Sequence, residues 1–451
     1  MVMNDVQPPR GPGQERRLDR TTFETSRLLD FVSGKELTFQ CVYGPESWPL
    51  VILKELLDNA LDACEERGIP PAITVTVDES RITVADNGPG IPPETVERML
   101  DFSVRVSSRE AYVAPDRGAQ GNALKTIVAM PFVLDGQVGR VDIAGGGTLN
   151  EIAIEVDRIA QRPNATVTTS AKLGSFVRVH WPASASSLRG VEANFLQVAA
   201  GFAVLNPHLS LVVDYFGDRP IEVEATDPTW AKWTPSSPTP AHWYRLEDLE
   251  RLIAAYLVHD RASGRVRTVR EFVAEFKGLS ATGKQKTILG GLGLARAPLS
   301  DLTRNGDLDH DLICRLLDAM KAESKAVQPA ALGLIGRDHL LARLQDIGIV
   351  PESFEYRKEL TLGADGLPQV TEIAFGALED ASAERHFVCG VNWSAAWVNP
   401  FRTLGKHGEG LAAWLRNARA SAEEPIVIVV HVAHPRVQYT DRGKSSVASH
   451  G

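Results

Sequence analysis

The sequence lacks the features that mark several common classes of protein. Its four cysteines, Cys41, Cys64, Cys314 and Cys389, lie far apart and form no CxxC pair, so neither a zinc knuckle nor a disulfide framework is indicated. The first twenty residues hold prolines and charges but no apolar run long enough for a signal peptide or a membrane span. We therefore expect buried free thiols, a disordered tail over residues 1–20, no membrane contact and a cytoplasmic location.

An excess of positive charge is also missing. The chain holds 48 Lys and Arg against 57 Asp and Glu, which gives a formal net charge of −9. Because binding to nucleic acid backbones depends on releasing counterions from phosphates, an acidic chain is expected to contact double-stranded DNA only through local patches. One basic run offers such a patch, although scattered charges on helices more often form a solvated face: Arg261, Arg265, Arg267, Arg270, Lys277, Lys284 and Lys286.

The length of 451 residues, with 43% hydrophobic and 23% charged content, suits a globular α+β protein with several domains. Residues 21–235 mix helix and strand patterns, and a proline-rich stretch over 227–241 marks a boundary. Residues 240–345 have a mainly helical pattern. Residues 346–451 combine alternating strand patterns with one short helix, which predicts a separate α+β domain.

The first of these parts begins with clear local patterns. Residues 48–66 place apolar side chains at three-four spacing, which predicts an amphipathic helix with one buried stripe. Two alternating runs, 73–77 and 81–87, predict a hairpin that ends at Asp86. The segment from Pro92 places proline at a first helical turn and predicts a second helix.

The stretch 105–122 is different, because it mixes arginine, serine, proline and glycine with little periodicity. A loop of that length inside a compact domain is usually functional or mobile, so we predict a lid. Strands are predicted over 176–181 and 209–216, which makes the domain a layer of helices on a mixed sheet.

Three polar residues of the first helix, Glu55, Asn59 and Asp62, are predicted to project from nearly one face. An amide oxygen is a hard ligand that suits Mg²⁺, and a carboxylate one turn earlier can accept a proton from water that attacks a phosphoryl group. Taken alone, the three residues would more often be a solvated helix face. Two further motifs change that balance.

The motif Asp86–Gly90, DNGPG, stands at the end of the hairpin. An ionised carboxylate there can accept a hydrogen bond from the exocyclic amine of adenine, and Gly88 and Gly90 permit close approach of the backbone to a ligand. The motif Arg117–Asn122, RGAQGN, precedes a predicted helix ALKTIVAM, so its backbone N–H groups can bind phosphate oxygens. Each motif is weak by itself, but their order is informative.

Together these motifs resemble the GHKL ATPases. ELLDNALDA stands for the family's Glu-and-Asn box, DNGPGIP for its adenine-reading box and RGAQGNA for its phosphate lid, while Gly174-Ser175 stands where the family usually has Gly-Thr. The resemblance implies an N-terminal Bergerat α/β sandwich that binds ATP and Mg²⁺, with Glu55 polarising the attacking water and Asn59 holding the metal. The nucleotide-binding residues that it implies are Asn59, Asp62, Asp86, Gly88, Gly90, Gly118, Gln120, Gly121, Asn122, Lys125 and Ser175.

Within this superfamily the chain resembles the B subunit of topoisomerase VI. KELLDNALDACEERGIPPAI looks like that subunit's opening domain, TTFETSRLLDF like its N-terminal strap and VVHVAHPRVQYTDRGKSSVA like its transducer domain. The resemblance implies a helix-two-turns-helix-like domain over 240–345, a transducer-like domain over 346–451, and Lys444 as a catalytic contact to the terminal phosphate. It also implies an ATP-induced homodimer that acts with a separate DNA-cleaving subunit.

These motifs predict an ATP-hydrolysing clamp, but other classes share parts of them. A histidine kinase usually has asparagine where this chain has Glu55, and no dimerising helix with a phosphoacceptor histidine is found. A chaperone or mismatch-repair type of GHKL ATPase, acting on a protein client, would use the same pocket. A nucleotide-regulated interaction module without turnover is the third alternative.

Overall fold

The computed structural model describes residues 27–102, 111–117, 123–363, 365–402, 410–417, 423–440 and 446–447. Several predictions lie outside these residues, namely those for the tail 1–20, Gly118, Gln120, Gly121, Asn122 and Lys444. None of the described helices is both long enough and apolar enough to cross a lipid bilayer.

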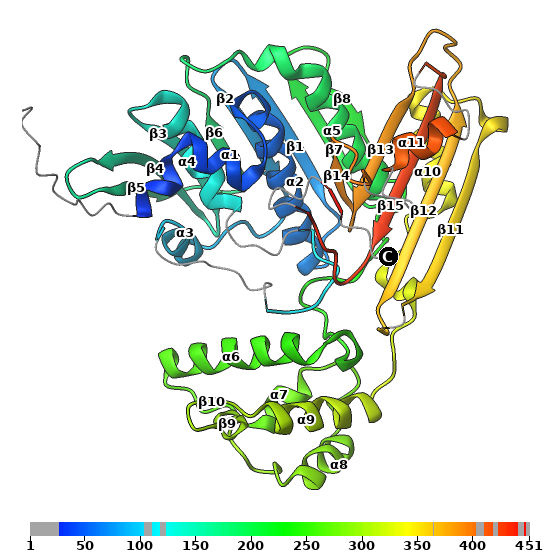
Figure 1. The fold of residues 1–451 in the computed structure, drawn as a ribbon. Helices are drawn as coiled ribbons and strands as arrows, with labels where there is room; N and C mark the ends of the chain where they lie inside the picture. The colour runs from blue at the N-terminus through cyan, green and yellow to red at the C-terminus, as the bar shows by residue number, and fades with distance from the viewer. Residues whose placement is uncertain are drawn as a thin grey trace, which may run out of the picture.

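The first part of the chain is a layer of helices on an eight-stranded mixed sheet with the order β5-β4-β3-β6-β2-β1-β7-β8 (Figure 1). The strands are β1 (Ala72–Asp78), β2 (Arg81–Asp86), β3 (Gly139–Gly145), β4 (Thr148–Asp157), β5 (Arg162–Ala171), β6 (Ser175–His180), β7 (Ser210–Tyr215) and β8 (Ile221–Val223). The helices are η1 (Arg27–Val32), α1 (Gly34–Cys41), η2 (Pro45–Ser47), α2 (Trp48–Glu66), α3 (Pro93–Met99), α4 (Ala123–Asp135), η3 (Leu188–Val191) and α5 (Glu192–Leu205). The predicted helix-on-sheet architecture is confirmed.

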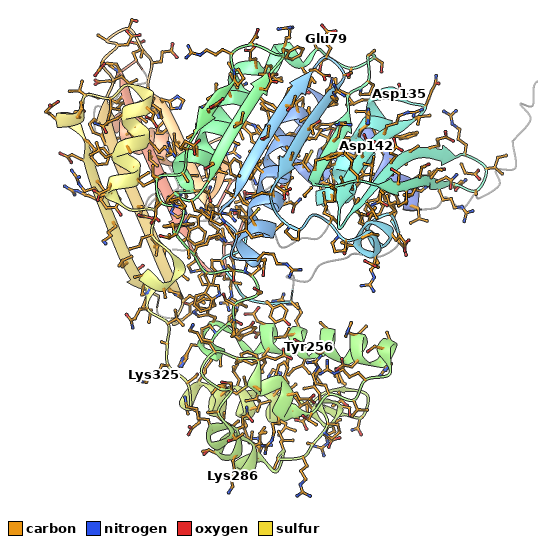
Figure 2. The ribbon with its side chains drawn as sticks, turned by 180° about the vertical axis from the view of Figure 1, so that it is seen from behind. Glu79, Asp135, Asp142, Tyr256, Lys286 and Lys325 are labelled. Carbon is orange, nitrogen blue, oxygen red and sulfur yellow. The ribbon has the colours of Figure 1, made fainter. Side chains whose placement is uncertain are left out.

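The alternation of β1 explains how the sheet is covered. Ile73, Val75 and Val77 are buried, whereas Thr74 between them is exposed, because successive side chains of a strand point to opposite faces. Helices α2, α4 and α5 contact β2, β3 and β7. Seen from behind, the opposite face of this sheet carries no layer of helices from the described residues (Figure 2).

Helix α2 follows its predicted bounds but is more buried than predicted. Its apolar stripe is buried as expected, and Asp58 and Asp62 are buried as well. The reason is that α2 contacts the sheet, α4, α5 and a strand of the C-terminal sheet. The prediction of one buried apolar stripe is therefore confirmed for the face of α2 that contacts the sheet. It is wrong for the face that contacts α5 and the C-terminal sheet, because that face is buried as well.

The middle of the chain is mainly helical, as predicted, and forms a body below the first sheet in Figure 1. In it α9 packs on α6 and α8, α7 packs on α8, and β9 and β10 form a short two-stranded ribbon. Their bounds, with those of the ribbon, are η4 (Ala241–Trp243), α6 (Leu246–Ser263), α7 (Val269–Ala274), α8 (Thr282–Leu292), η5 (Leu299–Leu302), β9 (Thr303–Arg304), β10 (Asp307–Leu308) and α9 (His310–Ala322).

The last part is a five-stranded sheet with the order β11-β12-β15-β13-β14. Helix α11 packs on one face of it through Leu411 and Leu415, while α10 and α5 contact β12, β13 and β14. Its elements are η6 (Pro329–Leu332), α10 (Arg337–Ile347), η7 (Pro351–Ser353), β11 (Glu355–Leu362), β12 (Pro368–Ala377), β13 (His386–Val391), β14 (Ser394–Ala396), α11 (Gly410–Asn417) and β15 (Ile426–Ala433). Because α5 also contacts β7, the two large sheets share one helix.

Candidate functional site

A narrow pocket opens between α2 and the ends of β2, β3 and β6. Asn59, Asp86, Gly90 and Ser175 line it together with apolar side chains, and the cavity volume is about 40 Å³. These four residues come from three separate segments of the sequence, since Asp86 and Gly90 share one motif. The structure thus brings together four members of the predicted site.

Asp86 is held in a fixed orientation in the lining of this pocket. Strands β2 and β6 pair so that Asp86 lies opposite Ser175, and the Ser175 hydroxyl donates to Asp86 Oδ2 at 2.9 Å. The Gly88 N–H donates to Asp86 Oδ1 at 2.8 Å. Burial raises the pKa of Asp86, while these two hydrogen bonds act in the opposite direction. Each oxygen keeps a lone pair that can accept from a ligand amine.

The loop after β2 depends on glycine. Gly90 has a φ of +72°, and a Cβ at this position would clash with the backbone of Gly145 at the end of β3. L side chains rarely adopt such a φ, so both the conformation and the lack of space require glycine. This close approach forms the wall of the pocket beside Asp86.

Asn59 presents an unsatisfied group to the same pocket. Its amide nitrogen Nδ2 is buried and has no hydrogen-bond partner among the described residues. Buried side-chain polar atoms nearly always have a partner, so the amide is suited to bind a ligand. Since nitrogen and oxygen of an amide are assigned from their surroundings, the same group can offer its oxygen to Mg²⁺, and the site therefore fits that ion.

Glu55 lies one turn before Asn59 on α2. Its side chain is 21% exposed, and its Oε1 is 3.9 Å from the Lys54 ammonium. It is therefore partly accessible to solvent, as are Asn59 and Asp86, and it is not itself a lining residue of the pocket. A carboxylate in this position can orient and polarise a water molecule.

Asp62 departs from the predicted arrangement. Its carboxylate does not line the pocket but accepts a hydrogen bond from Arg117 Nη1 at 2.7 Å. The physical reason is that α2 is buried on this side too, and a buried carboxylate is stabilised by a guanidinium. We therefore reassign Asp62 from nucleotide contact to the ion-pair network of Arg117.

Arg117, the first residue of the RGAQGN motif, is a fully buried cation to which the sequence analysis assigned no role. It also donates to both oxygens of Glu65, at 2.6 and 2.7 Å, and to Asn206 Oδ1 at 2.6 Å. Lys232 lies 2.9 Å from Glu65 Oε2. Burial alone would raise the pKa of Glu65, but Arg117 and Lys232 hold it well below its ordinary value. Asp58, Asp62 and Glu65 stand at three-four spacing on the largely apolar helix α2. Acidic residues on a buried helix need a cationic partner, so this spacing was the one signal in the sequence that could have indicated a buried cation.

Lys125 also lies outside the described pocket. It is 2% exposed on α4, and its ammonium donates to the backbone carbonyl of Asp101. Burial lowers its pKa.

The predicted basic run is divided by the structure. Arg267 is buried and donates to Asp260 and Glu275 at 2.9 and 2.6 Å, so its guanidinium is already engaged. Figure 2 shows Lys286 at the end of the helical body farthest from the first sheet and Tyr256 on the side toward that sheet. A larger cavity of about 620 Å³ lies between the helical body and the C-terminal end of α2, and none of the predicted site residues that the structure describes lines it.

Comparison with known proteins identifies the segment that carries the pocket. Residues 45–184 match the family described as histidine kinase-, DNA gyrase B-, and HSP90-like ATPase. The chain contains a GHKL ATPase domain. Its helix α2, its Asp86 loop and its Ser175 strand all lie within the matched residues.

Relatives of the GHKL domain include proteins named as the B subunit of type 2 DNA topoisomerase 6. The protein from Pyrococcus abyssi is 34% identical over 112 residues, which is 24% of this chain and 20% of that protein. The protein from Archaeoglobus fulgidus is 36% identical over 102 residues, or 22% of this chain and 17% of that protein. The matched part of the chain thus spans about a fifth of the length of these relatives.

The solved structures that resemble the chain do so at low sequence identity. The ATPase region of Saccharomyces cerevisiae topoisomerase II is 12% identical with a TM-score of 0.39, and the match covers 88% of this chain and 76% of that one.

Proposed function

We propose that this chain binds ATP with Mg²⁺ in the pocket between α2 and β2 and hydrolyses the ATP. In this proposal ATP binding makes two copies of the chain dimerise into a clamp, and hydrolysis opens the clamp again. The observation that carries the proposal is the pairing of two groups across one pocket. Asp86 is oriented there by two donors, and the buried amide of Asn59 is without a hydrogen bond to the described residues. The membership of this segment in an ATPase family supports the same conclusion.

In this proposal the residues have distinct tasks. Asp86 accepts a hydrogen bond from the adenine amine, and Gly90 lets the purine approach the backbone. The cavity of about 40 Å³ must widen to admit the ring. Asn59 holds Mg²⁺, which when bound neutralises charge on the phosphates. Glu55 polarises the attacking water.

Further parts of the proposal concern residues and partners beyond the pocket. Gly118, Gln120, Gly121 and Asn122 close over the phosphates, and Lys444 contacts the terminal phosphate. Residues 21–235, 240–345 and 346–451 act as ATP-binding, helical and transducer-like domains. By analogy with the topoisomerase subunits named above, the clamp acts in the cytoplasm with a separate DNA-cleaving or other partner on double-stranded DNA.

Glu55→Gln tests the hydrolytic step. The substitution removes the carboxylate that accepts the proton, so we expect kcat to fall by about 100-fold or more, while ATP affinity changes less than about twofold. Glu97→Gln, which removes an exposed carboxylate of α3, is the matched control and should leave kcat unchanged. Wild-type turnover in Glu55→Gln would contradict the assigned role, and absence of binding heat with ATP and Mg²⁺ in the wild type would contradict the whole proposal.

The same preparation separates the clamp on DNA from a clamp on a protein client. If linear double-stranded DNA stimulates ATP hydrolysis, and if this stimulation falls steeply as the salt concentration rises, the result supports DNA as the partner. Indifference to DNA favours the chaperone or mismatch-repair type of activity. Light scattering with a non-hydrolysable ATP analogue measures dimerisation directly.

A further inference from the structure

The turn between β13 and β14 has an unusual backbone. Asn392 and Trp393 have φ values of 49° and 63°, and two residues with positive φ form the type I′ turn that joins tightly paired strands. Asparagine tolerates this conformation, but tryptophan rarely adopts it. Trp393 is 0% exposed. A strained conformation of this kind persists only where the surrounding structure holds it in place.

The turn is held by contacts with the GHKL domain and with its own sheet. Asn392 Nδ2 donates to the Asp116 carbonyl at 3.1 Å, and Asn206 Nδ2 donates to the Trp393 carbonyl at 3.0 Å. The Trp393 N–H donates to His431 Nε2 at 3.2 Å. Hydrogen bonds from the N-terminal domain and from the C-terminal sheet therefore both hold the turn in place.

Ser394, the next residue, contacts the helix that carries the proposed base. Its hydroxyl donates to Asp58 Oδ2 at 2.7 Å. The same oxygen accepts from the Lys54 ammonium at 2.8 Å, and that ammonium is 3.9 Å from Glu55 Oε1. A chain of three contacts thus leads from the C-terminal sheet to Glu55.

Lys54 stands between two carboxylates that compete for it. It lies 2.8 Å from Asp58 and 3.9 Å from Glu55. An ammonium bound tightly to Glu55 would stabilise the ionised carboxylate and make it a weaker base toward water. Asp58 therefore keeps Glu55 reactive only while it retains the ammonium.

Other charged groups around this pair do not replace the Ser394 contact. Arg117 Nε is 3.9 Å from Asp58 Oδ1, and Asp58 Oδ1 accepts no hydrogen bond from the described residues. Tyr439 interacts electrostatically with Lys54. Within the described part of the chain, Ser394 is thus the donor outside α2 that is within hydrogen-bond distance of the Asp58 carboxylate.

We propose that Ser394 is a positioning residue for Glu55, because its hydroxyl fixes the Asp58 carboxylate that holds Lys54 away from the base. This inference rests on the proposed hydrolytic function and adds to it a route by which the C-terminal sheet controls the reaction. When the strained turn shifts, Asp58 loses a donor and the ammonium moves toward Glu55. The position of the turn then sets the rate of hydrolysis.

Ser394→Ala tests the inference by steady-state ATP hydrolysis. We expect kcat to fall about tenfold, in line with the loss of one hydrogen bond to a charged group, with KM changed less than about twofold. Ser394→Thr keeps the hydroxyl and should restore kcat. Ser353→Ala, which removes a hydroxyl of the same part of the chain whose hydrogen bonds go to Val350 and Ala377 and not to α2, should match the wild type.

The set of variants separates positioning from a loss of structure. A positioning role predicts a lower kcat with a nearly unchanged KM in Ser394→Ala and a recovery of kcat in Ser394→Thr. A wild-type kcat in Ser394→Ala would overturn the inference, as would a Ser394→Thr variant as impaired as Ser394→Ala.

A crystal structure of Ser394→Ala gives a result that does not depend on turnover. The Lys54 ammonium should lie nearer to Glu55 than to Asp58 in the variant, and unchanged positions would overturn the inference. If the wild-type protein failed to hydrolyse ATP, the proposed function would fall, while this structure would still decide whether Ser394 positions Lys54.

Discussion

At the scale of the residue, the proposed binding of adenine depends on the Asp86 carboxylate, which must remain ionised although it is partly buried. Burial raises the pKa of Asp86, and the donors Ser175 and Gly88 oppose that effect. The ionised form is the one that accepts from an amine on both oxygens. The Ser175 hydroxyl should therefore matter most when the pH is low.

Ser175→Ala is expected to lower ATP affinity about three- to tenfold at pH 7, as the loss of one hydrogen bond predicts. The decrease should be larger near pH 5, because without the hydroxyl the pKa of Asp86 rises further and the carboxyl group is protonated at higher pH. Calorimetry with a non-hydrolysable analogue at both pH values measures this. Thr169→Ala, which removes a hydroxyl on β5 away from the pocket, is the control, and equal affinity for Ser175→Ala and the control at pH 5 would refute the role.

Local motifs, together with the GHKL resemblance that they carry, were sufficient to predict Asn59, Asp86, Gly90 and Ser175 as members of one pocket. They were not sufficient for Asp58, which the sequence shows only as one more polar residue of α2. Its role depends on Ser394, a residue far along the chain whose proximity is decided by the packing of the C-terminal sheet. No spacing rule within a helix can predict such a contact.

At the scale of the element, the loop from β2 to α3 shapes the pocket by a close approach of two backbones. Gly90 and Gly68 have nearly equal φ values of +72° and +65°. A Cβ on Gly68 would meet no atom of the described residues within 4 Å, whereas a Cβ on Gly90 would clash with Gly145. The two glycines therefore separate the effect of conformation from the effect of space.

Gly68→Ala should lower the free energy of unfolding by about 1 to 2 kcal/mol, the cost of a left-handed conformation for alanine. Gly90→Ala should cost clearly more, since the loop must also move away from β3, and it should weaken ATP binding as well. Urea unfolding and calorimetry of the two variants measure these quantities. Equal losses of stability in both variants, with unchanged ATP binding, would contradict the close-approach interpretation.

Some helices and strands could be predicted from the sequence and others could not. The hairpin β1–β2 and helix α2 carry clean periodic patterns and were predicted with nearly correct bounds. Strand β5 is polar and largely exposed along its length, so it has no alternation to detect. Helix α5 is buried on most sides between two sheets, and a helix without a polar face gives no amphipathic signal.

At the scale of the whole molecule, a buried acid in the C-terminal sheet connects several elements. Glu372 accepts hydrogen bonds from the backbone N–H groups of Ile335 and Gly336, both at 2.9 Å, and from the Tyr356 hydroxyl at 2.7 Å. His431 Nδ1 lies 3.4 Å from it. Burial alone would raise the pKa of Glu372, but His431 and the backbone donors lower it to about 2.

This lowered pKa predicts how stability depends on pH. A carboxyl group with a lowered pKa in the folded state stabilises the fold above its unfolded pKa, and this stabilisation is lost as the pH falls. For Glu372 the loss should occur between pH 4.5 and about 2, and it should amount to about 3 kcal/mol at most.

Urea unfolding at a series of pH values compares the wild type with Glu372→Gln. The variant should be less stable at pH 7, and the difference between the two proteins should shrink as the pH falls through this window. Glu359→Gln, at an exposed position of β11, should follow the wild type. A difference between wild type and Glu372→Gln that is constant with pH would contradict the prediction.

The sequence by itself, through its motifs and the GHKL resemblance that they carry, determined the GHKL domain, its sheet-and-helix layers and the four pocket residues, because each motif is a pattern within a short stretch of chain. Tertiary structure alone decided that Asp62 binds Arg117, that Asp58 binds Ser394 and that α5 serves two sheets. Buried charges find partners wherever folding brings an opposite charge or a donor, and that depends on how distant elements pack.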